Sequence, residues 1–113
     1  MRAEALKGHL DGLLLALLES GPTHGYAVIE ALRAGSGGTF DLPTGTVYPA
    51  LHRLEGLGLV ASTWSQGPGR RRRVYALITA GRTALSEHRA GWQEFAGAVQ
   101  SVMNGGQPWT SVS

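Results

Sequence analysis

The stretch 59–78 constrains the fold more than any other, because it is the one part of the chain with the pattern of a β-hairpin. Its two arms read VASTWSQ and RRRRVYALI, and both are rich in the β-branched and aromatic residues that favour strands. The link between them is Gly67-Pro68-Gly69, which combines a fixed φ with residues that tolerate positive φ and so predicts a turn. Two strands alone are marginally stable in water, so this hairpin must pack against the rest of the chain.

The segments before the hairpin predict helices. Leucines recur at helical spacing between Ala5 and Ser20, and Gly21-Pro22 ends this first predicted helix. Leu15 lies nearly opposite the centre of the leucine stripe, so it is either a tolerated surface residue or part of an interface with another subunit. A second helix is predicted after Thr23, whose hydroxyl is a suitable N-cap. The glycines at 35, 37 and 38 end it.

A third helix is predicted within Pro43–Val60, and its two faces differ in chemistry. At about 100° per residue, the apolar face consists of Val47, Ala50, Leu51, Leu54 and Leu57. The other face is small, hydroxylated or cationic and consists of Gly45, Thr46, Pro49, His52, Arg53 and Gly56. Thr44 is the expected cap, and Pro49 removes one amide and so distorts the first turn. The outer face has no carboxylate near its centre, which suits contact with phosphate and predicts a DNA-recognition helix.

The last predicted helix runs from Ala80 to about Met103, with Thr79 as its cap. Its apolar residues recur about every 3.5 positions, which is typical of a coiled-coil seam rather than of a core face. Together with apolar surface left over on the first helix, this seam predicts an obligate dimer. The expected organisation is a DNA-binding domain over 1–78, a dimerisation helix over 79–104 and a flexible tail over 105–113.

Composition limits the class of protein. The 113 residues suffice for one domain, and 42% hydrophobic with 16% charged residues indicates a globular chain. No apolar run approaches the roughly 20 residues of a membrane span, and the N-terminus lacks the pattern of a signal peptide. The absence of cysteine excludes disulfides and thiolate zinc sites. We therefore expect a soluble, cytoplasmic protein with no membrane partner.

Charge is concentrated rather than abundant. The net charge of +2 is modest, but four of the ten basic residues are consecutive, at 70–73, while the eight acids are scattered singly. Alone, such a run is more often a solvated turn or a processing site. Its place on a hairpin directly after a two-faced helix favours a basic patch for nucleic acid instead.

The order of the predicted elements gives the fold class: mainly α with a small β-hairpin. Three helices, a hairpin with a basic tip and one more helix form the layout of a winged helix-turn-helix with a C-terminal dimerisation helix. In that layout the third helix enters the major groove of DNA, and the hairpin, or wing, reaches neighbouring phosphates or the minor groove. Arginine suits such a wing because its planar guanidinium donates several hydrogen bonds to phosphate.

Three segments of the chain resemble the PadR family of bacterial transcriptional regulators. They read LKGHLDGLLLALLESGPTHGYAVIEAL, TGTVYPALHRLEGLGLV and RRVYALITAGR, and they lie within residues 6–82. The resemblance implies a homodimeric repressor whose C-terminal helix packs against the first helix of the partner, and whose dimer often responds to small hydrophobic or phenolic effectors. With one helix after residue 80, this chain resembles the small members. It departs from the family pattern at Pro43-Thr44, where serine then proline is usual, and at Ala80-Gly81, where acids are usual.

Candidate site residues follow from the order of the predicted elements and from the family resemblance. The predicted DNA-binding residues are Thr44, Thr46, Tyr48, His52, Arg53, Arg70, Arg71, Arg72 and Arg73. The resemblance makes Tyr48 a phosphate contact, with a core tyrosine as the alternative. Arg53 is the leading single candidate, although contact with phosphate is more common than contact with a base. His24 is expected to be structural.

A second candidate site is a pore at the centre of the dimer. The resemblance implies that this pore binds a small aromatic effector and is lined by Trp92, Phe95 and either Leu13 or Leu14. The alternative is that these side chains only pack the dimer. The histidines at 9, 24, 52 and 88 lack ligand spacing, so no metal and no cofactor are expected.

Two other classes of function compete with a DNA-binding repressor. A winged helix can bind protein instead of DNA, in which case its basic tip would face an acidic partner. An enzyme needs a base, a nucleophile and an orienting group brought together, and the scattered serines, histidines and acids offer no such set. The sequence therefore predicts a non-enzymatic regulator whose partners are an operator duplex, a second copy of the chain and a small effector.

Overall fold

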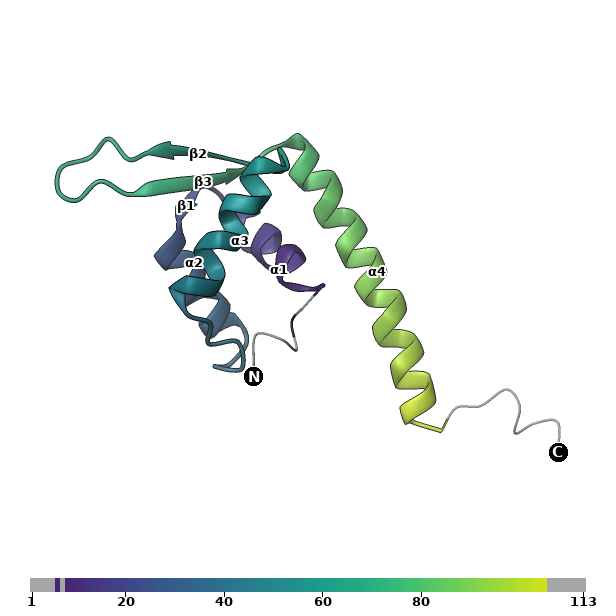
Figure 1. Ribbon diagram of the computed structural model, residues 1–113. Helices are drawn as coiled ribbons and strands as arrows, with labels where there is room; N and C mark the ends of the chain where they lie inside the picture. Colours follow the sequence, from purple (N-terminus) through teal and green to yellow (C-terminus); the bar gives the residue numbers. More distant parts are fainter. Residues whose placement is uncertain (1–5, 7, 106–113) are drawn as a thin grey trace, which may run out of the picture.

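The computed structural model describes residue 6 and residues 8–105. The elements, in chain order, are α1 (Leu10–Leu18), β1 (Thr23–His24), α2 (Gly25–Gly35), α3 (Thr44–Gly56), β2 (Val60–Trp64), β3 (Arg73–Leu77) and α4 (Thr79–Met103). Helices α1 to α3 gather into a body, the β2–β3 hairpin projects from it, and α4 runs away from the body as a long arm (Figure 1). The predicted fold class, mainly α with a small β-hairpin, is confirmed.

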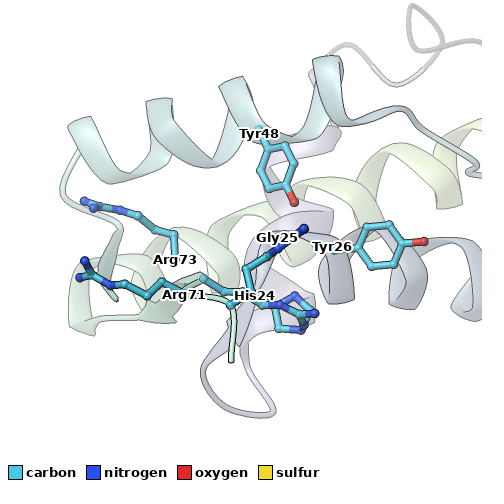
Figure 2. Close-up of a pocket in the computed structure, with 8 residues that line it drawn as sticks. His24, Gly25, Tyr26, Tyr48, Arg71 and Arg73 are labelled. Atoms are coloured by element: carbon cyan, nitrogen blue, oxygen red, sulfur yellow. The ribbon is translucent and has the colours of Figure 1, made fainter. Parts of the chain in front are cut away.

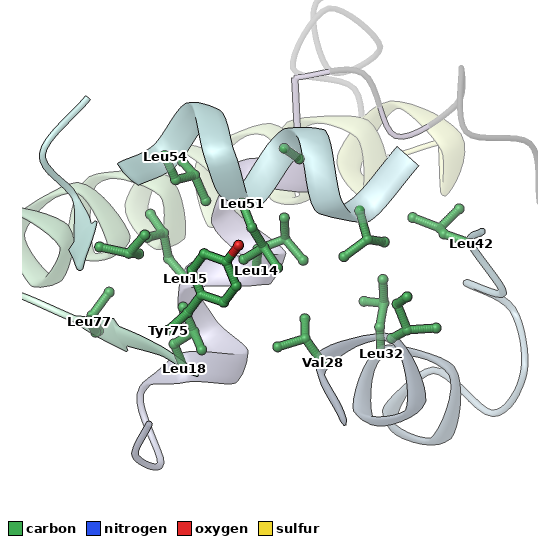
Figure 3. Close-up of a cluster of buried hydrophobic side chains, with 14 of the residues drawn as sticks. Leu14, Leu15, Leu18, Val28, Leu32, Leu42, Leu51, Leu54, Tyr75 and Leu77 are labelled. Atoms are coloured by element: carbon green, nitrogen blue, oxygen red, sulfur yellow. The ribbon is translucent and has the colours of Figure 1, made fainter. Parts of the chain in front are cut away.

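One hydrophobic core lies between α1, α2, α3 and the base of the sheet (Figure 3). The side chains of Leu14 and Leu15 on α1, Val28 on α2 and Leu51 on α3 are fully buried in it. Leu15 was expected at the surface, and this prediction was wrong. Because α2, α3, β3 and α4 all contact α1, the buried arc of this helix is wider than its leucine stripe suggests.

The sheet contains one strand more than the predicted hairpin. Its order is β1-β3-β2, and both pairings are antiparallel. The prediction of Thr23 as the N-cap of the second helix was wrong, because Thr23 lies in β1 and pairs with Tyr75. The N-cap is His24, whose Nδ1 accepts a hydrogen bond from the backbone amide of Ala27 at 3.2 Å. A strand of two residues is too short to produce a sequence pattern.

Several predicted helix ends also change. The structure starts α1 at Leu10 and ends it at Leu18, inside the predicted 5–20. Neither Thr44 nor Thr79 is a cap: each is the first helical residue, and the preceding Pro43 and Ile78 occupy the N-cap positions without a side-chain hydrogen bond. Leu57, expected on the buried face of α3, follows the last residue of the helix and is exposed.

The hairpin prediction is confirmed with shorter strands. The register pairs Val60 with Leu77 and Trp64 with Arg73, so most of the arginine run lies in the connection between the strands. Gly69 adopts a φ of +92° there, a value that favours glycine. We call β2, β3 and the connection between them the wing. The predicted tail, with Trp109 in it, lies outside the described residues apart from position 105.

The buried residues of helix α4, Gly81 and Leu85, lie near its start. The backbone carbonyl of Leu59, just before β2, accepts a hydrogen bond from the Ile78 amide at 3.3 Å, and Gly81 lies so close that a Cβ would overlap this carbonyl. Leu85 is buried against the core. Further along, α4 carries an exposed apolar stripe, which consists of Trp92, Phe95, Val99, Val102 and Met103.

Gly81→Ala is expected to destabilise the fold by about 1–3 kcal/mol, because the added methyl group meets backbone rather than a movable side chain. Urea denaturation at a fixed protein concentration measures the change. The matched control is Gly97→Ala on the same helix, where a Cβ meets nothing within 4 Å. Replacing an open helical glycine by alanine stabilises by up to about 1 kcal/mol. Equal effects at both positions would contradict the packing of Gly81 on Leu59.

Candidate nucleic-acid interface

The outer face of α3 is exposed along the predicted residues. Thr44, Tyr48, His52 and Arg53 are exposed, and Thr46 is half-buried. The opposite face, with Val47, Ala50, Leu51 and Leu54, is buried in the core. Pro49 lies on the outer face and does not interrupt the helix. The two-faced character predicted for α3 is therefore confirmed, apart from Leu57.

A hollow of about 500 Å³ separates α3 from the wing (Figure 2). It is lined by His24, Gly25, Tyr26, Tyr48, Arg70, Arg71, Arg72 and Arg73. The structure thus brings Tyr48, predicted from helix α3, together with the four arginines predicted from the wing, although more than 20 residues separate them in the sequence. Guanidinium and phenol groups both donate hydrogen bonds, so the lining suits an anionic ligand such as the phosphate backbone of DNA.

The sequence His24-Gly25-Tyr26 forms one wall of this hollow. His24 caps α2, as its expected structural role requires. Gly25 is buried, and a Cβ at this position would overlap the ring of Tyr48. Tyr26 is exposed beside it (Figure 2). Glycine is needed here because it lets Tyr48 lie directly against the start of α2, which places the phenol ring at the edge of the hollow instead of in the core.

Trp64 on β2 organises two of the wing arginines. The Cζ atoms of Arg71 and Arg73 lie 4.9 and 5.2 Å from the Trp64 ring centroid, a distance at which a guanidinium and an aromatic ring attract each other. The sequence analysis did not select Trp64. Its signal was the hairpin register, because Trp64 pairs directly with Arg73, but the length of the turn had to be known first.

Arg73 differs from the other wing arginines in being held by contacts with β2 and α3. Its Nε donates to Ser62 Oγ at 2.8 Å, and its Nη2 lies 3.6 Å from Glu55 Oε2 on α3. Ser62 Oγ in turn donates to Glu55. These contacts connect the wing to α3, so Arg73 has a structural role in addition to any contact with DNA.

Arg72 lies beside His24 in a contact that the imidazole cannot fully satisfy. Arg72 Nη1 is 2.9 Å from His24 Nε2, while His24 Nδ1 accepts from Ala27. A neutral imidazole has one acceptor and one donor nitrogen. Only one of the two ring nitrogens can therefore accept, so a neutral His24 ring satisfies either the Ala27 amide or Arg72, but not both.

Arg53 points toward α1 and is paired with Asp11. Its Nη1 and Nη2 donate to the two carboxylate oxygens of Asp11 at 2.6 and 2.7 Å. The hydrogen bonds to Asp11, together with its negative charge, raise the pKa of Arg53 above its ordinary value. The sequence analysis did not select Asp11, because two residues 42 positions apart leave no local pattern.

The family of the chain follows from comparison with known proteins. Residues 14–87 match the model of the family described as "Transcriptional regulator PadR-like family", and this range contains α3 and the whole wing. The chain belongs to this family. The resemblance noted in the sequence is therefore confirmed, and the PadR-like chain is a transcriptional regulator, which implies regulation through DNA binding. Members of the family are regulators and not enzymes.

Individual relatives support this assignment. The PadR-like chain is 48% identical over 72 residues to the transcriptional regulator Rv3488 of Mycobacterium tuberculosis. These 72 residues cover 64% of this chain and 64% of that protein. Its structure is similar to that of a PadR family transcriptional regulator from Eggerthella lenta, with a TM-score of 0.77, 31% identity and coverage of 90% and 88% of the two chains. A transcriptional regulator from Clostridium thermocellum shares the fold, with a TM-score of 0.81, 22% identity and coverage of 89% and 96%.

A second cluster of predicted residues in this PadR-like chain lies between α1 and α4. The ring centroids of Trp92 and Phe95 are 6.0 Å apart, and they lie 5.2 and 6.3 Å from the ring of His9. Leu14 is fully buried in the core, whereas Leu13 is only partly covered. Of the two leucines named as alternatives, only Leu13 is therefore partly exposed.

Over the described residues, no group of histidine, aspartate and glutamate side chains is arranged to hold a metal ion. None of the helices in that part of the chain is long and apolar enough to span a membrane.

Proposed function

We propose that this PadR-like regulator is a homodimeric repressor that places α3 in the major groove of an operator half-site and the wing on the flanking phosphates. The observation that carries the proposal is the hollow between α3 and the wing, which is lined by Tyr48 and the four arginines. On α3, Thr44, Thr46 and His52 face the groove, and Tyr48 donates to a phosphate. A helix in the major groove with a basic element beside it contacts phosphates on both sides of the bases it reads.

The division of the chain follows from these roles. Residues 1–78 form the DNA-binding domain, residues 79–104 form the dimerisation helix and 105–113 form a tail. The exposed stripe of α4 supports the second assignment, because Phe95 is 56% exposed and Val102 68% exposed in the single chain. A large contiguous apolar surface of this kind is typical of an interface. Two copies related by a twofold axis would cover it and would read two half-sites.

The aromatic cluster is proposed as the site of a small aromatic effector. Trp92, Phe95 and Leu13 would line it, and offset or edge-on stacking on the two rings favours a flat ligand. An effector seated between α4 and α1 would change the geometry of the dimer and release the operator. The proposed location of the protein is the cytoplasm.

The decisive experiment measures binding of the protein to the DNA upstream of its own coding region over a range of salt concentrations. Repressor binding through several arginines predicts that the logarithm of the affinity falls steeply and linearly with the logarithm of the salt concentration, because neutralised phosphates release counterions. The alternative, a winged-helix module for an acidic protein partner, predicts no specific binding to this duplex. A random duplex of the same length is the control.

Trp64→Ala is expected to weaken operator binding about twofold to tenfold. Without the ring, Arg71 must be ordered when DNA binds, at a cost of about 0.5–1.5 kcal/mol, whereas Arg73 keeps its contacts with Ser62 and Glu55. Fluorescence anisotropy of a labelled duplex measures the change, and Trp64→Phe should restore part of the affinity because a smaller ring still attracts guanidinium. Unchanged affinity in the alanine variant would show that the stacking does not prepare the wing for DNA.

A further inference from the structure

We propose that Asp11 sets the DNA affinity of this regulator by neutralising Arg53, so that the most prominent cation of α3 does not act as a phosphate contact. The inference rests on the proposed function, since it concerns the same DNA-facing surface. It gives Asp11 the role of a positioning residue, and it replaces the sequence-based prediction that Arg53 is the leading DNA contact.

The geometry of the pair is that of a strong, directional contact. Both terminal nitrogens of the guanidinium donate to both carboxylate oxygens, at 2.6 and 2.7 Å. Such bidentate pairs are shorter and stronger than single ion pairs. The side chain of Arg53 is 52% exposed, so it is within reach of solvent and of a ligand, whereas that of Asp11 is 26% exposed. The carboxylate is thus the better fixed partner.

The first turn of α1 keeps this carboxylate in place. His9 and Gly12 flank Asp11 in the sequence, and both contact α4 on the other side of the helix: His9 lies against Trp92, and Gly12 lies against the side chain of His88. The turn that carries Asp11 is therefore held between α3 and α4. Arg53 can leave the pair by rotating its own long side chain, but Asp11 cannot follow it toward DNA.

Arg71 and Arg72 in the wing have partners of a different kind. Arg71 lies over the Trp64 ring, and Arg72 lies beside the His24 ring. A ring leaves the positive charge of a guanidinium in place, whereas a bidentate carboxylate cancels it at distances beyond a few ångströms. The wing therefore presents net positive charge to DNA, and the Asp11–Arg53 pair presents none.

Removing the carboxylate should make Arg53 available. Asp11→Asn keeps the shape of the side chain and frees one positive charge at the edge of the DNA-facing surface. One further phosphate contact steepens the slope of log affinity against log salt by about 0.9. At 0.1 M salt this corresponds to a gain in affinity of up to about eightfold. Because phosphate carries no base information, the gain should be similar for operator and random duplexes.

The experiment compares the full chain with Asp11→Asn, Arg53→Gln and the double variant, by anisotropy on both duplexes from about 50 to 200 mM salt. Glu19→Gln is the matched control: Glu19 also forms a bidentate pair, with Arg89 of α4 at 2.7 and 3.1 Å, and its neutralisation changes the net charge equally. We expect the steeper slope and tighter binding for Asp11→Asn only. The double variant replaces one neutral pair by another, so its affinity should lie within about twofold of the wild type, as expected if Arg53 neutralises no phosphate.

Two results would overturn the inference. In the first, Asp11→Asn binds DNA no more tightly than Glu19→Gln. In the second, the double variant loses affinity and its slope becomes shallower by about 0.9, which would make Arg53 a direct phosphate contact. Circular dichroism checks the fold of each variant, and the double variant tests the idea even where Asp11→Asn folds poorly. If the wild type itself binds neither duplex, the proposed function fails instead.

Discussion

Replacing Arg70, Arg71 and Arg72 together by alanine is expected to weaken operator binding by up to about 500-fold at 0.1 M salt. Each arginine that neutralises one phosphate contributes about 0.9 to the slope of log affinity against log salt, so the slope should fall by roughly 2.7. Arg73 is left in place because it is held by Ser62 and lies near Glu55, and its loss would also remove contacts that connect the wing to α3. Anisotropy titrations at several salt concentrations give both numbers.

The control removes positive charge elsewhere. Arg33 is paired with Glu30 on α2, and Arg89 is paired with Glu19 beside α4, so their replacement by alanine lowers the net charge without changing the wing. This variant should keep most of the slope. If the two variants lose affinity equally, the wing arginines act only through net charge. If neither loses any, the hairpin does not meet DNA, and the protein-interaction alternative becomes the better reading.

Phe95→Glu is expected to raise the dissociation constant of the dimer at least about 100-fold. Burying a phenylalanine side chain contributes about 1.5–3 kcal/mol, and a twofold interface loses this contribution twice. The introduced carboxylates would also face each other across an apolar surface. Sedimentation should then show monomers at micromolar concentration. Operator affinity should fall steeply as well, because two half-sites no longer bind as one unit.

Ala90→Glu is the matched control for this charge on α4. Ala90 is exposed and, at about 100° per residue, lies on the side of the helix away from the Trp92–Phe95 stripe. The Ala90 variant should remain dimeric and bind DNA as the wild type does. A wild-type protein that sediments as a monomer, or a dimer that survives Phe95→Glu, would move the interface away from α4.

The parts of the fold that the sequence predicted well are those with a local pattern. The hairpin was predicted because its arms and turn are adjacent, and the apolar stripe of α4 was predicted because its period lies within a single helix. In both cases neighbouring residues suffice to define the element. The basic character of the wing followed directly, since the arginines are consecutive.

The parts that the sequence did not predict depend on residues far apart in the chain. Leu15 was misplaced because its burial depends on elements that cover α1 from several sides, and Thr23 because β1 exists only as a partner of β3. The candidate site shows the same limit. The partner of Arg53 is Asp11, 42 positions away, and the arginine partners of Trp64 depend on a register that the turn determines. Such contacts are set by tertiary structure, and they produce no recognisable spacing of residues in the sequence.

The close approach of Gly81 to Leu59 has a consequence for the spacing of the two half-sites in the operator. Only Ile78 separates β3 from α4, and its amide donates a hydrogen bond to the Leu59 carbonyl, so the orientation of the arm relative to the wing is set at this junction. In the proposed dimer, the angle and position at which the two α4 helices cross would then determine the distance between the two wings. The identity of the half-site would be read by α3 and its spacing by α4. Exchanging the arm between related chains would change the length of the preferred operator while leaving its half-site sequence alone.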